Sequence, residues 1–166
     1  MAAQSLRRRR FITGMKLKDR VRAHTSREVN RRIEEQTEHR VLQAATAADT
    51  AISRRIDELE NEWDMERFLE TNASALAFAG IALGLAINKK FFAIPAIVLP
   101  FLFQHAVQGW CPPVPVFRRF GVRTRKEIDA EKYALKAVRG DFDNLPVANN
   151  GDTVRRARQA WQAAKA

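Results

Sequence analysis

The sequence has little cysteine: its 166 residues include only Cys111. An intrachain disulfide and a zinc site built on several cysteines are therefore excluded. The histidines, His24, His39 and His105, are scattered without metal-ligand spacing, and there is no Walker-type glycine loop, no G-x-S-x-G and no C-x-x-C. With these motifs missing, we expect a protein that is not an enzyme and that needs no cofactor.

Glycine and proline are missing from a long part of the chain. There is no glycine between Gly14 and Gly80, and no proline before Pro95. Because these residues interrupt helices, their absence predicts one very long helix, or two in line, from about residue 17 to residue 87. The arginine-rich segment before it is followed by polar residues and not by the apolar stretch of an export signal, so we expect a basic cytoplasmic tail.

Two apolar runs occupy the middle of the chain, ASALAFAGIALGLAI at 73–87 and FFAIPAIVLPFLF at 91–103, separated by Asn88-Lys89-Lys90. Each run is apolar around its whole circumference, as expected in lipid or in the core of a large protein. A chain of this length, with 29% charged residues, has no such core to offer. We therefore predict a transmembrane helical hairpin in an all-α protein. The alternative is a buried hairpin in a soluble helical domain.

The first apolar run carries small residues at helical spacing, Ala73, Ala77, Gly80 and Gly84. Such a face lets helix backbones approach closely in lipid. It predicts packing in the membrane, either of the hairpin on itself or of one copy on another. In the second run Pro100 is expected to kink the helix.

A narrow apolar stripe follows the predicted N-terminal arm at steps of three and four residues. Its members are Val41, Ala45, Ala48, Ile52, Ile56, Leu59 and Trp63. The pattern repeats after eleven residues, which keeps a stripe nearly straight along a helix. We expect a helix–helix seam, formed with a second copy, with a partner protein or with the C-terminal helix. The alternative is a lone amphipathic helix on the membrane surface.

The C-terminal part begins with a stiff proline segment. Thr124 and Glu127 then form a capping box that opens a helix, and Gly140 ends it. A last basic helix from about Thr153 is expected to be a surface anchor or a docking segment. The segments expected in chain order are a basic tail at 1–16, a coiled-coil-like cytoplasmic arm at 17–66, the hairpin at 67–111 with spans at about 68–87 and 91–110, a juxtamembrane segment at 112–123, a helix at 124–140, a linker at 141–152 and the basic helix at 153–166.

The basic residues predict an orientation. Lys and Arg number 29 against 19 Asp and Glu, and many flank the outer ends of the two spans, whereas the connecting turn holds only Lys89 and Lys90. By the positive-inside rule both termini are cytoplasmic. The residues expected to contact anionic headgroups are Arg118, Arg119, Arg123, Arg125 and Lys126. A nucleic-acid partner is not expected, because no stacking aromatics or fold signature accompany the basic charge.

The end of the second span carries a motif, Gln108-Gly109-Trp110-Cys111-Pro112-Pro113, followed by Gly121-Val122-Arg123-Thr124. With the preceding hairpin, this motif resembles the YgaP-like transmembrane domain family over roughly residues 64 to 124. The resemblance implies a small bacterial inner-membrane module, of a kind mostly of unknown function and sometimes fused to a rhodanese sulfurtransferase domain, which this chain lacks.

Two interpretations of Cys111 within this motif are possible: a reactive thiol and a packing residue. Nearby cations would favour a thiolate, and a reactive thiol would make the protein a sulfur-handling or small-anion transport module. In the other reading Cys111 is a small apolar residue that packs the turn after the span. We predict a non-enzymatic inner-membrane anchor, scaffold or accessory subunit that forms a homo-oligomer or joins a larger membrane complex, with the Cys111 module as the alternative.

Overall fold

The structure is a computed structural model, which describes residues 19–143, 145 and 153–165. Within these residues every regular element is a helix, so the predicted all-α class is confirmed. The elements are α2 Arg20–Ala23, α3 Arg27–Ala44, α4 Asp49–Asn61, α5 Met65–Ala86, the 3-10 helix η1 Lys89–Phe92, α6 Ala93–Gln108, α7 Val114–Arg119, α8 Arg125–Arg139 and α9 Thr153–Lys165. The predicted tail at 1–16 and most of the linker at 141–152 lie outside the described residues.

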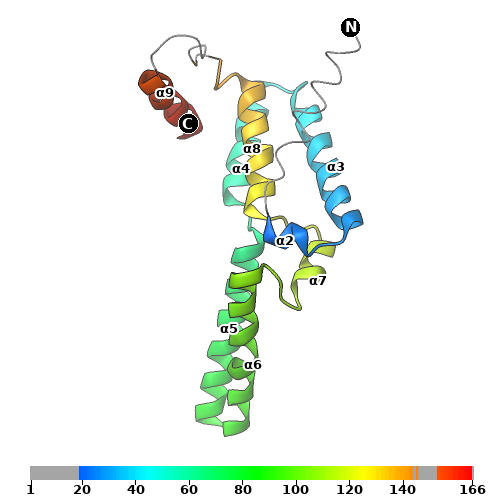
Figure 1. Ribbon diagram of the computed structural model, residues 1–166, viewed down its shortest axis with the longest axis vertical. Coiled ribbons are helices and arrows are strands. Elements are labelled where there is room, and N and C mark those ends of the chain that lie inside the picture. Colours follow the sequence, from blue (N-terminus) through cyan, green and yellow to red (C-terminus); the bar gives the residue numbers. More distant parts are fainter. Residues whose placement is uncertain (1–18, 144, 146–152, 166) are drawn as a thin grey trace.

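The molecule has two parts, which Figure 1 shows one above the other. The helices α2, α3, α4, α7 and α8 form a bundle that we call the head. Below it α5 and α6, joined through η1, extend side by side and are called here the apolar pair. The helix α9 lies beside the end of the head that is far from the apolar pair.

The prediction of one continuous helix, or of two helices in line, from residue 17 to residue 87 is wrong, because the chain forms α2, α3, α4 and α5 there. Polar side chains cap two of the new starts. Ser26 accepts a hydrogen bond from the Val29 amide at the start of α3, and Asp64 accepts one from the Arg67 amide at the start of α5. Capping satisfies free amides at a helix start. The chain folds back on itself in the turn between α3 and α4 (Figure 1).

The core of the head lies between α4 and α8. Ile52, Ile56 and Leu59 are buried against Ile128 and Leu135. The stripe thus meets α8, a helix in the C-terminal part of its own chain that precedes the last helix, α9.

Three members of the predicted stripe lie elsewhere, and their assignment to one seam is wrong. Ala45 and Ala48 are exposed in the turn between α3 and α4, and Trp63 is 41% exposed beyond the end of α4. The Trp63 ring packs against Phe68 instead, with 5.4 Å between the ring centroids. Val41 and Ala44 pack at the edge of the α4–α8 core. Because the helix is broken after α3, the stripe residues before and after the break do not share one helix face, as they would on a single continuous helix.

The helix α8 matches its sequence signature. The Thr124 side chain accepts from the Glu127 amide, and the Glu127 side chain accepts from the Thr124 amide, which completes the predicted capping box. Gly140 ends the helix in the left-handed region. The predicted last helix is also present as α9, and the Lys136 ammonium donates to the Ala164 carbonyl oxygen at 3.1 Å.

The small residues of α5 face α6 of the same chain. A Cβ added at Gly80 would lie 2.6 Å from Pro95 Cδ, and one added at Gly84 would lie 2.9 Å from the Phe92 ring. Ala77 is buried on the same face and Ala73 is half-buried. Gly80 and Gly84 therefore allow α5 and α6 of the same chain to approach each other closely. Pro100 lies inside α6, which continues to Gln108.

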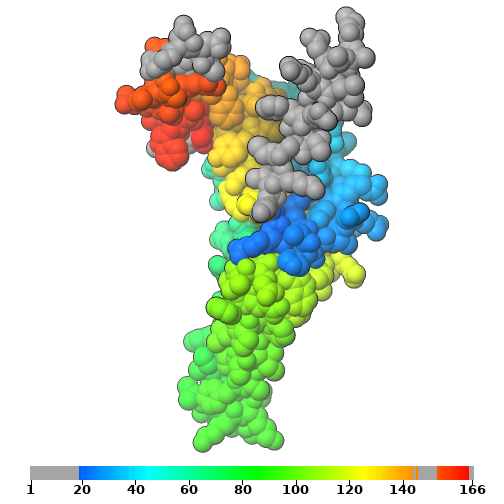
Figure 2. All heavy atoms as spheres, viewed as in Figure 1, coloured from blue at the N-terminus to red at the C-terminus, as the bar shows by residue number. Residues whose placement is uncertain are grey.

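The rest of the apolar pair exposes large apolar side chains. Leu85 and Phe78 are 77% and 76% exposed, and Phe103 is 72% exposed. Figure 2 shows this part protruding from the head without cover from other elements. By length and composition the helical stretches Asp49–Ala86 and Lys89–Gln108 are able to cross a membrane, and only 22% and 11% of their apolar windows are buried. A core helix of a soluble domain would be mostly buried, so this surface needs another cover.

Candidate functional site at the junction of the head and the apolar pair

The short helix α2 is fastened to the end of α6. The Arg20 Nη1 atom donates to the carbonyl oxygens of Ala106 and Val107 at 2.6 and 3.1 Å. The last carbonyls of a helix have no partner inside the helix and carry its negative dipole end, so a guanidinium satisfies and stabilises them. Arg20 therefore joins the first element of the head to the apolar pair, and we call this contact the Arg20 clasp.

Gly109 makes this close approach possible. It ends α6 with a φ of +77°, and a Cβ built on it would lie 2.3 Å from Arg20 Cβ and 2.8 Å from the Arg20 carbonyl carbon. A side chain would therefore meet both an unfavourable backbone conformation and the backbone of α2. The glycine of the Gly109-Trp110-Cys111-Pro112 motif thus has a structural role at the junction.

Cys111 lies in the apolar cluster under the clasp. It is 3% exposed and packs with Val21, Met65, Leu69 and Val114. Burial raises the pKa of the Cys111 thiol, although the hydrogen bond with the Val114 backbone acts in the opposite direction. The thiolate expected from nearby cations is therefore disfavoured, since reactive cysteines are accessible and have a lowered pKa. This placement fits the packing role. Trp110 beside it is half-buried and Pro112 is exposed.

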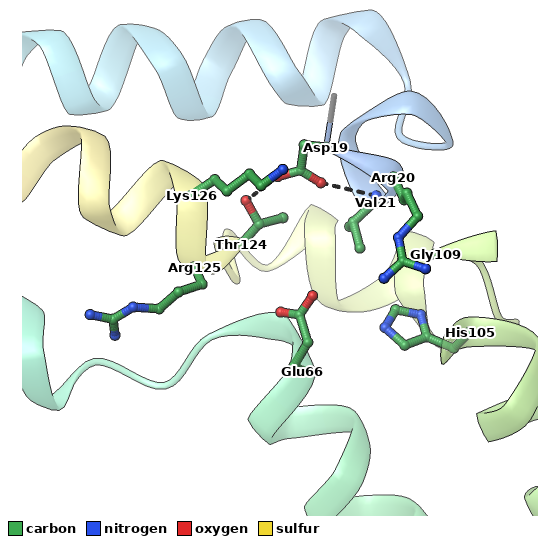
Figure 3. Close-up of a pocket in the computed structure, with 9 residues that line it drawn as sticks. All are labelled: Asp19, Arg20, Val21, Glu66, His105, Gly109, Thr124, Arg125 and Lys126. Carbon is green, nitrogen blue, oxygen red and sulfur yellow. Dashed lines mark hydrogen bonds between the residues drawn. The ribbon is translucent and has the colours of Figure 1, made fainter. Parts of the chain in front are cut away.

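A polar pocket of about 150 Å³ opens beside the clasp, between the head and the apolar pair. Figure 3 shows the lining residues, which come from α2, α5, α6, α8 and the segments between them: Asp19, Arg20, Val21, Glu66, His105, Gly109, Thr124, Arg125 and Lys126. Thr124 Oγ1 donates to Asp19 Oδ2 at 2.5 Å, and Asp19 Oδ1 accepts from the Val21 amide at 3.0 Å. Asp19 therefore links the start of α2 to the start of α8.

His105 at this pocket is 7% exposed. Helix α2 and the clasp cover it, although it lies in the last turn of α6. Its Nδ1 atom has no hydrogen-bond partner among the described residues. Within the same residues no group of three or more His, Cys, Asp or Glu side chains is placed to hold a metal ion.

A first buried ion pair joins Arg118 and Glu127 inside the head. Arg118, which is fully buried, donates to both carboxylate oxygens of Glu127 at 2.6 and 2.9 Å. It also donates to Asn30 Oδ1 at 2.8 Å and to the Val122 carbonyl oxygen at 3.1 Å. Such a two-pronged pair fixes geometry as well as charge, and here it joins α3, α7 and α8.

A second ion-pair network surrounds Glu131, which is also fully buried. Its carboxylate pairs with Arg123, with Arg55 at 3.0 Å and with Arg40 at 3.2 Å, and Arg123 in turn pairs with Glu62 at 2.5 Å. Burial acts to raise the pKa of Glu131, but the hydrogen bond from Arg123 and the charges of the three arginines outweigh it and lower the pKa. The network connects α3, α4 and α8 through one carboxylate.

These pairs correct the predicted lipid contacts. Arg118 is fully buried and Arg123 is 4% exposed, so neither is available to a headgroup. The prediction for these two residues is wrong because Glu127 pairs with Arg118, and Glu131 and Glu62 pair with Arg123, inside the head. Arg119 and Lys126 are exposed, and Arg125 is half-buried and pairs with Asp129 at 3.0 Å.

Sequence reasoning missed the Arg20 clasp and the ion-pair networks. The sequence does carry one signal for the networks: Glu127 and Glu131 are four residues apart on the same side of α8 as Ile128 and Leu135. Acidic residues on the apolar face of a helix indicate buried charges that need partners. Arg20 has no comparable signal, because its partners are backbone carbonyls.

Comparison of the chain with protein-family profiles, curated proteins and solved structures gives no match. The resemblance of the Gly109-Trp110-Cys111-Pro112 segment to the YgaP-like domain therefore stays a prediction. The functional argument rests on the apolar pair and on the junction.

Proposed function

We propose that this protein is a two-span membrane protein whose head acts as an anchored scaffold or accessory subunit, without enzymatic activity of its own. The single observation that carries the proposal is the apolar surface of α5 and α6, of which most is exposed. Lipid is the cover that such a surface requires, since both helices satisfy their backbone internally. The proposal includes membership of the YgaP-like family, on the motif at the end of α6.

The orientation and location in the proposal are those of a bacterial inner membrane, with the head and both termini in the cytoplasm. Arg54, Arg55 and Arg67 precede the first span and further arginines follow the second, whereas the turn at η1 has Lys89 and Lys90. Basic residues near span ends favour the cytoplasmic side, where the leaflet is also anionic.

The packing of the chain leaves fewer surfaces to which a partner could bind, because two of the predicted association faces are covered. The Ile52–Ile56–Leu59 seam is covered by α8, and the Gly80 and Gly84 face is covered by α6. We therefore place association on other surfaces, and α9 is the first choice. It exposes Val154 and Trp161, at 72% and 62%, and lies at the end of the head away from the apolar pair. In the proposed orientation this position suits docking of a protein and not contact with the same bilayer.

The membrane part of the proposal is tested by flotation with liposomes after detergent removal. The intact protein is expected to float and to resist extraction by alkaline carbonate. A variant with Phe78→Lys and Phe103→Lys should fail to insert, because central lysines cost about 2.5–3.5 kcal/mol each in a span. The matched control is Leu42→Lys, at a 62% exposed position on α3, which should float normally. Intact protein that stays soluble without detergent and does not float would refute the proposal.

The scaffold part is tested by crosslinking in native membranes and purification in mild detergent. A partner or an oligomer should be recovered, and Trp161→Ala should weaken its capture while leaving flotation unchanged. A monodisperse monomer without a crosslinked partner in native membranes would count against this role.

A further inference from the structure

The helix α7 has two different sides at the base of the head. Val114 and Arg118 are fully buried and Phe117 is half-buried on one side. The other side and the next residue expose Val116 at 51% and Phe120 at 81%. The exposed residues Pro115 and Arg119 lie on the same side. Apolar groups together with a cation on one exposed face are typical of a helix that lies at a membrane surface.

The position of α7 is fixed by contacts on both of its ends. The Phe117 ring packs on Phe68 of α5, with 5.7 Å between the ring centroids. Val114 belongs to the same apolar cluster as Leu69 of α5. At the other end Arg32 Nη2 of α3 donates to the Arg119 carbonyl oxygen at 2.8 Å. Because α7 is held on both sides, its depth relative to the apolar pair is defined.

This depth corresponds to the headgroup layer. The apolar run of α5 begins at Ala73, five residues after Phe68. A helix rises about 1.5 Å per residue, so α7 lies about 7.5 Å above the start of the apolar run. The headgroup region is roughly 5–7.5 Å thick in each leaflet, so α7 lies at its outer edge. Figure 1 shows α7 as the part of the head beside the upper end of the apolar pair.

We propose that α7 and Phe120 form an interfacial foot, which lies in the headgroup layer with Val116 and Phe120 directed toward the acyl chains of an anionic leaflet. The proposal rests on the proposed membrane function. It commits to lipid because the exposed face is continuous in depth with the apolar pair, and because Arg119 matches an anionic surface. A face of one six-residue helix is also small beside the roughly 800 Å² per partner of a stable protein interface.

The test uses site-directed spin labels, which the single cysteine makes practical. In a Cys111→Ala background, Phe120→Cys, Phe78→Cys and Leu42→Cys provide one label each. The variants are reconstituted in vesicles of phosphatidylethanolamine and phosphatidylglycerol, and accessibility to oxygen and to a water-soluble nickel chelate is measured. If Cys111→Ala lowers the yield of folded protein, the labels are placed in the unmodified chain. Buried Cys111 is then checked for labelling by mass spectrometry.

The three positions separate the possible outcomes. The label at 78 should report hydrocarbon, the label at 42 water, and the label at 120 an intermediate depth with at least tenfold less access to the nickel chelate than at 42. A label at 120 as accessible to the chelate as that at 42, with 78 still in hydrocarbon, would overturn the foot and leave the membrane function intact. If the label at 78 also reports water, the membrane function fails as well.

Discussion

Replacement of Gly109 by alanine tests the junction most directly. The residue has a φ of +77°, and an added Cβ would lie 2.3 Å from Arg20 Cβ. The left-handed conformation costs about 1–2 kcal/mol for a residue with a Cβ. The contact with α2 adds about 1–3 kcal/mol of overpacking, because Arg20 backbone atoms and not a flexible chain end are in the way. We therefore expect Gly109→Ala to lower the free energy of unfolding by about 2–5 kcal/mol.

Gly121 provides a matched control. It also has a positive φ, +86°, but nothing lies within 4 Å of an added Cβ. Gly121→Ala should therefore cost only the conformational part, about 1–2 kcal/mol. The difference between the two variants isolates the contact of Gly109 with α2.

The assay is thermal and denaturant unfolding in detergent micelles, followed by circular dichroism and by Trp fluorescence, since Trp110 is adjacent to the substitution. A double-mutant cycle with Arg20→Met adds a second readout. If alanine at 109 displaces α2, the Arg20 clasp is already broken, and Arg20→Met should no longer lower the free energy of unfolding in the Gly109→Ala variant. Equal destabilisation by Gly109→Ala and Gly121→Ala, with additive effects of Arg20→Met, would refute the junction.

Three further predictions concern the packing of the head and of the apolar pair. Glu131→Gln should destabilise the head by about 3 kcal/mol, since it removes the buried carboxylate charge that pairs with Arg123, Arg55 and Arg40, whereas the exposed control Glu58→Gln should change stability by less than about 0.5 kcal/mol. The folded pKa of Glu131 is lowered, so its contribution is present above the unfolded value near pH 4.3 and is lost as pH falls below it. In acid titrations followed by circular dichroism, Glu131→Gln should therefore lose less stability than the intact protein over that range. Ile56→Asp should unfold the head in the same assay without dissociating any oligomer, because the residue is 3% exposed against α8 of its own chain; oligomers that dissociate while the head stays folded would contradict this. Gly80→Val should separate α5 from α6 and lower the yield of inserted protein, whereas an unchanged yield in flotation would contradict the close approach to Pro95.

Features set by local sequence were predictable. The capping box at Thr124 and the end of α8 at Gly140 depend on residues that are neighbours in the chain. The two apolar stretches were predictable for the same reason, since a helix that is apolar all round is visible in composition alone. The same holds for α9, in which Val154, Ala157, Trp161 and Ala164 repeat with helical spacing.

Features set by contacts between distant residues were not predictable. The breaks before α3 and α5 occur at Ser26 and Asp64, which are also acceptable inside a helix at modest cost. Their use as caps depends on the fold, which bends the chain so that Ile52 and Leu59 meet α8. The pairing of Arg20 with the end of α6 joins residues 86 positions apart, and no periodic pattern encodes it.

The basic residues after the second apolar helix have one role during the proposed membrane insertion and another role in the folded head. The positive-inside rule counts arginine and lysine and gives little weight to acidic residues. On the proposed topology, Arg118 and Arg123 would therefore count fully toward a cytoplasmic C-terminus during insertion, before the head has folded. In the folded head Glu127 and Glu131 bury these same arginines, so they support the structure and no longer face the leaflet. Contact with lipid then falls to exposed residues such as Arg119, which lies beside Val116 and Phe120 on the proposed foot.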